Sequence, residues 1–281
     1  MTGCRSSRRR LPMADPWQRE APPYKEPPAF NIPGAVLALL AAIAGLHLLI
    51  EWLPLAAQRE VLFRFALFPL RYFGVNGVVE GLPGGFAAAI WTPITYTFLH
   101  GGWTHLIVNS VWLLAFGSPL ARRFGALRFF VFYFVCGAAG AFLHVAIYPG
   151  SPVPVVGASA AISGLMGGAA RFVFLGDGPL GALGGNRPAG APQRSAGIFA
   201  SLADRRTLIF VGVWIGLNFL FGATALSGAL GVTAQVAWEA HLGGFLAGLL
   251  LFGLFDPIRY SPSGGPGNVG YGEWLGKDRE K

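Results

Sequence analysis

Long apolar stretches without a charged residue organise the chain. The first runs from Ile32 to Ile50 and contains no Asp, Glu, Lys or Arg. A helix needs about 20 mostly apolar residues to cross a bilayer, so this stretch predicts a first membrane span. Two longer charge-free stretches, 81–121 and 129–170, are interrupted by Gly and Pro. Each of these predicts more than one structural element.

The breaks divide the remaining apolar sequence into further spans. Residues 148–157 hold three prolines and two glycines, which predicts a connection between two helices. Five further spans follow from the same criteria of length and charge, and with the first they predict a bundle of six transmembrane helices. They are expected at about 103–120, 126–147, 158–175, 207–222 and 236–255.

The region between the first two spans has a mixed pattern. Its segment Val61–Phe73 is too charged to span a bilayer and too apolar to be fully solvated. Such a segment is typical of an interfacial piece that lies along the membrane surface. We expect the first part of 81–121 to be loop and interfacial structure as well.

Composition supports a protein that lives in lipid. Of the 281 residues 53% are hydrophobic and only 12% are charged, against about 25% charged in a typical soluble domain. This excludes a disordered chain, a coiled coil and a disulfide scaffold. The two cysteines, Cys4 and Cys136, stand in a polar tail and an apolar run, so no disulfide is expected.

The net charge of +8 has a membrane explanation that needs no nucleic acid. With six spans, 18 of the 21 Lys and Arg residues fall in the N-terminal tail, the second and fourth loops and the C-terminal tail, all on one side. By the positive-inside rule, both termini are expected in the cytoplasm. The expected organisation is a polar tail over 1–31, a six-helix membrane domain over 32–255 and a flexible tail over 256–281.

A few polar residues inside the predicted spans carry the candidate chemistry. Polar groups in a membrane are costly, and each needs a reason. His105 and Asn109 stand in the first two turns of the second span, four residues apart and on one helix face. Ser159 stands in the first turn of the fourth span and His241 near the start of the sixth. All three spans enter from the outer side, so these four side chains are expected at one level.

Small residues next to this polar group predict that two of the helices approach closely. They recur every fourth position in the fourth and sixth spans, and such stripes let membrane helices pack tightly. The stripes are Ala160, Gly164 and Gly168, and Ala240, Gly244 and Gly248. Packing along them would place Ser159 beside His241, which is the minimum equipment of an activated serine nucleophile.

The remaining parts of a hydrolytic site can be assigned in the same way. The first-turn position of Ser159 supplies free backbone N–H groups, which with the Asn109 amide and an N–H of His105 could form an oxyanion hole. Glu239 is the nearest acid to His241, but residues two apart on a helix do not face each other. A Ser–His dyad is therefore predicted rather than a triad.

Other interpretations of these polar residues remain open. A serine in a membrane helix commonly bonds back to the carbonyl four residues earlier, and a small-residue stripe commonly serves packing alone. His47 and His144 are interpreted as structural, and Asn218 as a former of an interhelical hydrogen bond. No H-E-x-x-H run or other ligand spacing is present, so no metal or cofactor is expected.

At these residues the sequence resembles the rhomboid family of intramembrane serine proteases. Residues 100–109, HGGWTHLIVN, are similar to the family's H-x4-H-x3-N. Residues 157–164, GASAAISG, are similar to its G-x-S-G segment, and residues 240–244, AHLGG, to its A-H-x-x-G. The resemblance covers about residues 33–255, and the three motifs together are far more specific than any one alone.

The resemblance implies a function. Ser159 would be the nucleophile and His241 the general base, with His105, Asn109 and the Ser159 N–H around the oxyanion. Substrates would be single-span membrane proteins, cleaved near the outer end of their helix. The fifth span and the loop after it would form the gate and cap of the site, and the region 54–100 the family's first loop.

Departures and alternatives qualify this expectation. Ala160 stands where many relatives have Gly, and the first loop lacks the family's Trp-Arg pair. The alternative function is a non-catalytic, rhomboid-like protein that binds membrane helices; a small-solute transporter would require half-helix breaks at the midplane. The richness in Ala, Gly and Arg favours a bacterial cytoplasmic membrane. The natural substrate and the oligomeric state stay open.

Overall fold

The computed structural model describes residues 32–73, 82–85, 87–174, 195–222 and 237–257. The chain divides into two units, 1–31 and 32–281, and every described residue belongs to the second. The predicted N-terminal tail, most of the loop after the fourth span, the predicted gate loop and nearly all of the C-terminal tail therefore lie outside the described residues.

Among the described residues the regular secondary structure is helical, and the sole strand-like feature is one antiparallel bridge between Leu67 and Val155. This confirms the prediction of an all-α protein. The helices in chain order are α1 (Gly34–Glu51), α2 (Leu55–Phe65), η1 (Pro69–Arg71), α3 (Ala88–Thr95), η3 (Tyr96–Phe98), α4 (Trp103–Trp112), η4 (Leu113–Gly117), α5 (Ser118–Phe124), α6 (Ala126–Ile147), α7 (Ser159–Ala169), α8 (Ile198–Ala203), α9 (Arg205–Gly222) and α11 (Trp238–Phe255).

Four helical stretches of the described chain are long and apolar enough to cross a membrane, which marks an integral membrane protein. They are α1, the continuous run α4–η4–α5, α6 and α11. They match the predicted first, second, third and sixth spans. The second is continuous because η4, a π-helical turn, joins α4 to α5 without a break. The predicted fifth span, 207–222, is helical within α9.

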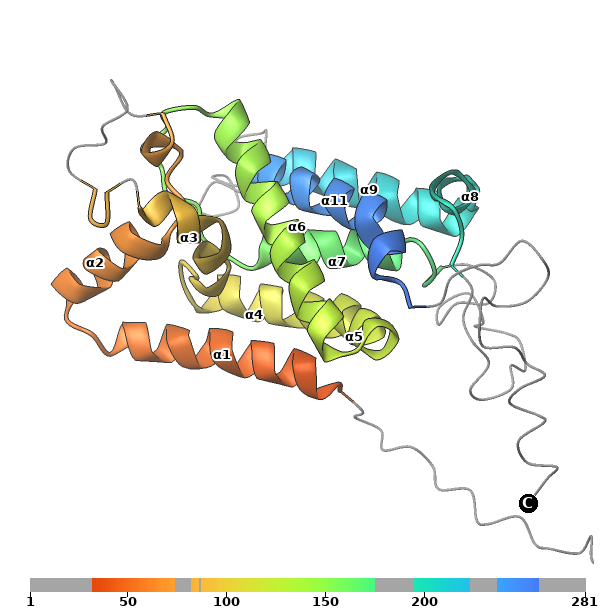
Figure 1. Ribbon diagram of the computed structural model, residues 1–281, viewed down its shortest axis with the longest axis horizontal. Helices are drawn as coiled ribbons and strands as arrows, with labels where there is room; N and C mark the ends of the chain where they lie inside the picture. Colours follow the sequence, from red (N-terminus) through yellow and green to blue (C-terminus); the bar gives the residue numbers. More distant parts are fainter. Residues whose placement is uncertain (1–31, 74–81, 86, 175–194, 223–236, 258–281) are drawn as a thin grey trace, which may run out of the picture. The chain divides into compact units, whose positions relative to one another are not determined.

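The predicted fourth span, 158–175, needs correction. Its helix α7 covers only Ser159–Ala169, 11 residues, or about 16 Å at the rise of an α-helix. Every residue from Ala160 to Ala169 is buried. In Figure 1 α7 lies in the middle of the helices, between α4, α6 and α11. Because other helices rather than lipid surround it, α7 does not need the length that a lipid-facing span requires.

Helices α7 and α11 pack backbone to backbone, as the small-residue stripes predict. A Cβ built on Gly244 would run into the carbonyl oxygen of Ala160, and one on Gly248 into the carbonyl oxygen of Gly164. The prediction was wrong for Gly168, whose Cβ would meet Leu120 and Phe132 instead. Because an α-helix has 3.6 residues per turn, positions four apart rotate gradually away from one face. Gly167 rather than Gly168 therefore makes the third close backbone contact with α11.

Helix α3 forms inside the predicted loop region, across a proline. Pro93 has no N–H, so it cannot bond to the carbonyl of Ala89 four residues earlier. The hydroxyl of Tyr72 donates to that carbonyl at 2.9 Å instead. The fully buried Arg71 donates to the carbonyls of Phe63 and Gly85, both at 2.6 Å. These bonds fold the first loop onto itself and onto α3.

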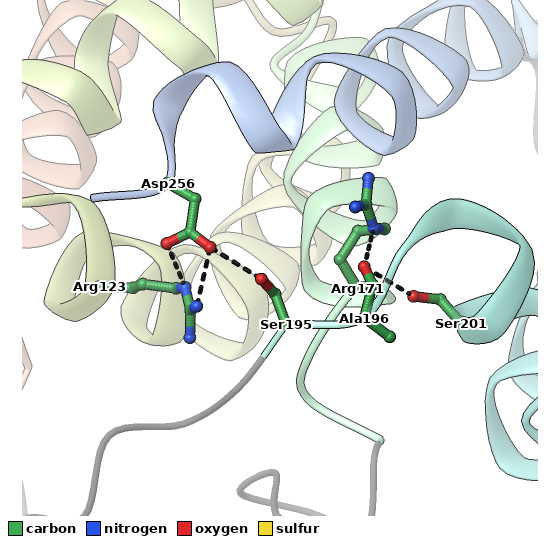
Figure 2. Close-up of polar contacts among 6 residues, drawn as sticks. All are labelled: Arg123, Arg171, Ser195, Ala196, Ser201 and Asp256. Carbon is green, nitrogen blue, oxygen red and sulfur yellow. Dashed lines mark hydrogen bonds and ion pairs between the residues drawn. The ribbon is translucent and has the colours of Figure 1, made fainter. Parts of the chain in front are cut away.

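A polar network joins the C-terminal ends of three helices (Figure 2). Arg123 at the end of α5 forms a two-pronged ion pair with Asp256, which follows α11, and both side chains are 4% exposed. Ser195 donates to the same carboxylate at 2.9 Å. Arg171, just beyond α7, donates to the carbonyls of Ala196 and Leu249. The network therefore fixes α5, α7 and α11 to one another far from Ser159, which begins α7.

Candidate active site

Ser159 is the first residue of α7, and the local backbone explains why its side chain is presented there. Gly157, two residues earlier, has φ of 123°, which side chains other than that of glycine rarely allow. Its N–H donates to the carbonyl of Tyr96 at 3.0 Å. The tight turn delivers Ser159, half-buried, to a helix N-terminus, where backbone N–H groups are free and the helix dipole is positive.

The structure brings Ser159 and His241 together. The Oγ of Ser159 lies 2.7 Å from the Nε2 of His241, within the range of a nucleophile bonded to its base. The two residues stand near the N-termini of α7 and α11, which run in the same direction. This confirms the prediction, made from the small-residue stripes, that the two side chains lie side by side.

The second ring nitrogen of His241 also has a partner. The Oδ1 of Asn218 on α9 lies 2.6 Å from the Nδ1 of His241. The amide nitrogen of Asn218 donates to the carbonyl of Trp214, one turn earlier, at 2.8 Å. The sequence-based interpretation of Asn218 as an interhelical hydrogen-bond former is thereby confirmed, but its partner was not foreseen.

The two predicted oxyanion residues gather at the turn that precedes Ser159. A Cβ on Gly157 would lie 2.7 Å from the Nε2 of His105 and 3.6 Å from the Nδ2 of Asn109. Asn109 is 6% exposed, and its Nδ2 makes no hydrogen bond within the described residues. An amide donor aimed at the turn beside a nucleophile is what stabilisation of a developing oxyanion requires.

The segment that leads to Ser159 is held by the first loop. Leu67 and Val155 exchange backbone hydrogen bonds of 3.1 and 2.8 Å, and the N–H of Leu70 donates to the carbonyl of Ser151 at 3.0 Å. The first loop therefore fixes the approach to the α7 N-terminus. The sequence located this loop at the interface but gave no sign of this pairing.

The other polar residues of the predicted spans have structural partners. Ser163 donates to the carbonyl of Ser159 at 2.8 Å, the local bond typical of serine in membrane helices. Glu239, 2% exposed, accepts from the hydroxyl of Tyr148 at 2.6 Å and lies 3.5 Å from the Nδ1 of His144. The carboxylate thus binds α6 and the turn after it, and not His241.

Two further histidines lie near His105. The ring of His100 stands edge-on to that of His105, with centroids 5.0 Å apart, and His47 packs against Trp103. Burial, with a smaller contribution from His105, lowers the pKa of His100 to about 4, so its ring is neutral near pH 7. Within the described part of the chain no three His, Cys, Asp or Glu side chains are arranged to hold a metal ion.

Asn218 is the site residue whose role sequence reasoning missed. Its signal was present, because it is the sole amide in the predicted fifth span. In the topology predicted from the charge distribution that span runs outward, so a residue near its end is expected at the same level as His105, Ser159 and His241. The sequence does not reveal how α9 is rotated about its axis, and that rotation decides whether Asn218 faces His241.

Comparison with known proteins places these residues in a recognised domain. The family model of the Rhomboid domain matches residues 87–256, more than half of the chain. RHOMBOID-like protein 4 of Arabidopsis thaliana is 29% identical over 177 residues, 63% of this chain and 35% of the relative. The Rhomboid protease GluP of Bacillus subtilis is 36% identical over 77 residues, 27% of this chain and 15% of the relative.

The relatives differ in size and in activity from one another. This chain spans about a third of the length of the first plant relative and less of the bacterial protease. Inactive RHOMBOID-like protein 8 of Arabidopsis thaliana is 35% identical over 78 residues, 28% of this chain and 22% of the relative. Sequence similarity alone therefore does not distinguish a protease from an inactive relative. That distinction depends on whether the site residues are present and correctly arranged.

Proposed function

Because the chain belongs to the rhomboid family, we propose that it is an intramembrane serine endopeptidase, with Ser159 as nucleophile and His241 as general base. The observation that carries the proposal is the 2.7 Å contact between the Oγ of Ser159 and the Nε2 of His241. A hydroxyl and an imidazole that lie half-buried side by side among membrane helices are costly, and a protein that only bound other helices would have no use for the pair.

In the proposed acylation step, the Oγ of Ser159 attacks the scissile carbonyl carbon while its proton passes to the Nε2 of His241. The carbonyl oxygen becomes an oxyanion, which the N–H of Ser159, the Nδ2 of Asn109 and the ring of His105 stabilise. When the C–N bond breaks, His241 returns the proton to the leaving amine. An acyl-enzyme remains on Ser159.

Deacylation repeats the chemistry with water as the nucleophile. His241 takes a proton from water as the water oxygen attacks the ester carbon. The tetrahedral intermediate collapses, the bond between carbon and Oγ breaks, and the proton passes from His241 to Ser159. The new carboxyl end leaves, and the enzyme is restored without a metal or cofactor.

The proposed substrates are single-span membrane proteins. A transmembrane helix keeps its carbonyls hydrogen-bonded, so it must unwind locally before a serine can reach one. Helix-weakening residues such as Gly would ease that step. The positions of Ser159 and His241 at the starts of α7 and α11 favour cleavage near one end of the substrate helix. The charge distribution favours cytoplasmic termini and a site that opens on the other side. The richness in Ala, Gly and Arg favours a bacterial inner membrane.

The test is a cleavage assay in liposomes with a tagged single-span substrate. The wild type should cleave the substrate, and Ser159→Ala and His241→Ala should each reduce cleavage to background while the helical content stays unchanged. Ser110→Ala is the matched control, since its hydroxyl only bonds to the carbonyl of Leu106 within α4. Cleavage at the wild-type rate by Ser159→Ala would refute the mechanism.

The same variants test the alternative, a non-catalytic protein that binds membrane helices. A serine-directed fluorophosphonate should label the wild type and not Ser159→Ala. A folded wild type that binds the substrate helix but neither cleaves it nor reacts with the probe would support the alternative and overturn the protease.

A further inference from the structure

We propose that Asn218 is a positioning residue that fixes the tautomer and the orientation of His241, so that the working unit is Ser159–His241–Asn218. The inference rests on the proposed protease function, and it concerns a residue outside the three sequence motifs. Its starting point is the 2.6 Å contact between the Oδ1 of Asn218 and the Nδ1 of His241.

The second hydrogen bond of the Asn218 amide decides which of its ends faces the ring. The amide nitrogen can donate to the carbonyl oxygen of Trp214, which is only an acceptor, and does so at 2.8 Å. If the amide were flipped, two oxygens would face each other at Trp214. The end that faces His241 is therefore the oxygen, which can only accept.

An acceptor at Nδ1 determines where the ring carries its proton. The short contact requires an N–H on Nδ1, and in a neutral imidazole the Nε2 is then a bare acceptor. The Oγ–H of Ser159 donates to that nitrogen across 2.7 Å. Asn218 therefore selects the one neutral tautomer that can take the proton from Ser159, which is the role of the third residue in other serine and cysteine hydrolases.

An independent contact holds the register of α9 against α11. The ring of Trp214 stacks on that of Phe245 with centroids 4.4 Å apart and planes inclined by 21°. Trp214 lies one turn before Asn218 and Phe245 one turn after His241, so the stack and the hydrogen bond are successive contacts of two antiparallel helices. Glu239, the acid nearest in sequence to His241, is bound to Tyr148 and cannot replace the amide.

The kinetic test uses four substitutions on α9. Asn218→Ala and Asn218→Leu remove the acceptor, so kcat should fall about 10- to 100-fold while KM changes less than about twofold. The expected loss is smaller than the roughly 10⁴-fold loss known for a charged third residue, because the amide is neutral. Asn218→Asp keeps an acceptor at Nδ1 but loses the donor to the Trp214 carbonyl, so it should recover kcat only in part, to within about tenfold of the wild type. Leu217→Ala, 47% exposed on the next position, is the matched control and should be unchanged.

The pH profile separates positioning from a merely structural role. A carboxylate in Asn218→Asp stabilises the imidazolium, so the acidic limb of kcat/KM should move to higher pH. His105, which interacts electrostatically with His241, is the same in every variant. A substitution that only loosened α9 would lower activity at all pH values alike and leave the limb in place.

A measurement without turnover distinguishes failure of this inference from failure of the proposed function. The ring ¹⁵N signals of ¹⁵N-histidine-labelled protein in detergent report the tautomer, and His241 is assigned by its absence in His241→Ala. The wild type should show Nδ1 protonated and Nε2 bare, and Asn218→Ala should lose this preference. If Asn218→Ala keeps the wild-type tautomer and kcat, the inference is overturned. If the wild type lacks both cleavage and probe labelling but shows the Asn218-dependent tautomer, only the proposed function fails.

Discussion

The substitution Gly244→Ala tests whether backbone contact between α7 and α11 sets the geometry of the site. A methyl group at Gly244 would overlap the carbonyl oxygen of Ala160, a backbone atom that cannot rotate away. The two helices would have to separate by about 1.5 Å to restore an ordinary contact distance. His241 lies one turn before Gly244, so the shift would stretch its 2.7 Å contact with Ser159 beyond hydrogen-bonding range.

The size of the effect follows from two opposing contributions. Overpacking of a close contact costs about 1–3 kcal/mol, and replacement of a helical Gly by Ala returns up to about 1 kcal/mol. The net loss of about 1–2 kcal/mol corresponds to a fall in Tm of about 2–8 °C. Activity should fall further, because a displacement of about 1 Å between reacting groups can cost about 100-fold in rate.

The assay compares Gly244→Ala with Gly253→Ala on the same helix. A Cβ on Gly253 meets no atom within 4 Å, so this variant should keep full activity and a Tm equal to or above that of the wild type. Tm is followed by circular dichroism in detergent and activity by substrate cleavage in liposomes. Wild-type Tm and cleavage in Gly244→Ala would refute the idea that this contact positions the dyad.

Three further outcomes are expected. Asn109→Ala should lower kcat about 100- to 1000-fold with little change in KM in the cleavage assay, as loss of one oxyanion donor does, and an equal effect on KM would argue against that role. Arg123→Ala removes the two-pronged, buried ion pair with Asp256 and should cost about 3–5 kcal/mol in the unfolding free energy. Arg64→Ala removes an exposed pair and should cost less than about 1 kcal/mol. Equal losses would contradict the structure. The pKa of His100 is lowered from 6.5 to about 4 in the folded protein, so the unfolded state binds more protons in between and Tm should fall as pH drops from about 6.5 to 4. His100→Asn should lessen that fall, and an unchanged pH dependence would show that His100 does not contribute.

The sequence predicted those features of the fold that depend on long local patterns. Scarcity of charge over about 20 residues located α1, α6 and α11 closely, because burial in lipid constrains nearly every residue of a span. The same criterion overestimated the length of α7, since a helix enclosed by other helices does not have to match the thickness of the bilayer. The small-residue stripes correctly predicted that α7 packs against α11, because close backbone contact requires small residues that recur about once per helical turn.

The site was predictable where its residues lie on one helix or beside a packing stripe. Ser159 and His241 were paired because Gly244 and its counterparts bring their helices together. Asn218 was missed as a partner of His241, because a single amide in an apolar helix does not reveal which way that helix is rotated. The bridge between Leu67 and Val155 was equally invisible, since backbone pairing of two short segments leaves no periodic pattern.

The central claim, that Ser159 is a nucleophile activated by His241, is tested most directly by locating a covalent adduct. The full chain in detergent is treated with a fluorophosphonate, digested and analysed by mass spectrometry. The account predicts one adduct on the peptide that contains Ser159, at the Oγ, with no adduct in Ser159→Ala and at least 100-fold slower labelling in His241→Ala. An adduct on another serine, or labelling that is as fast without His241, would contradict it.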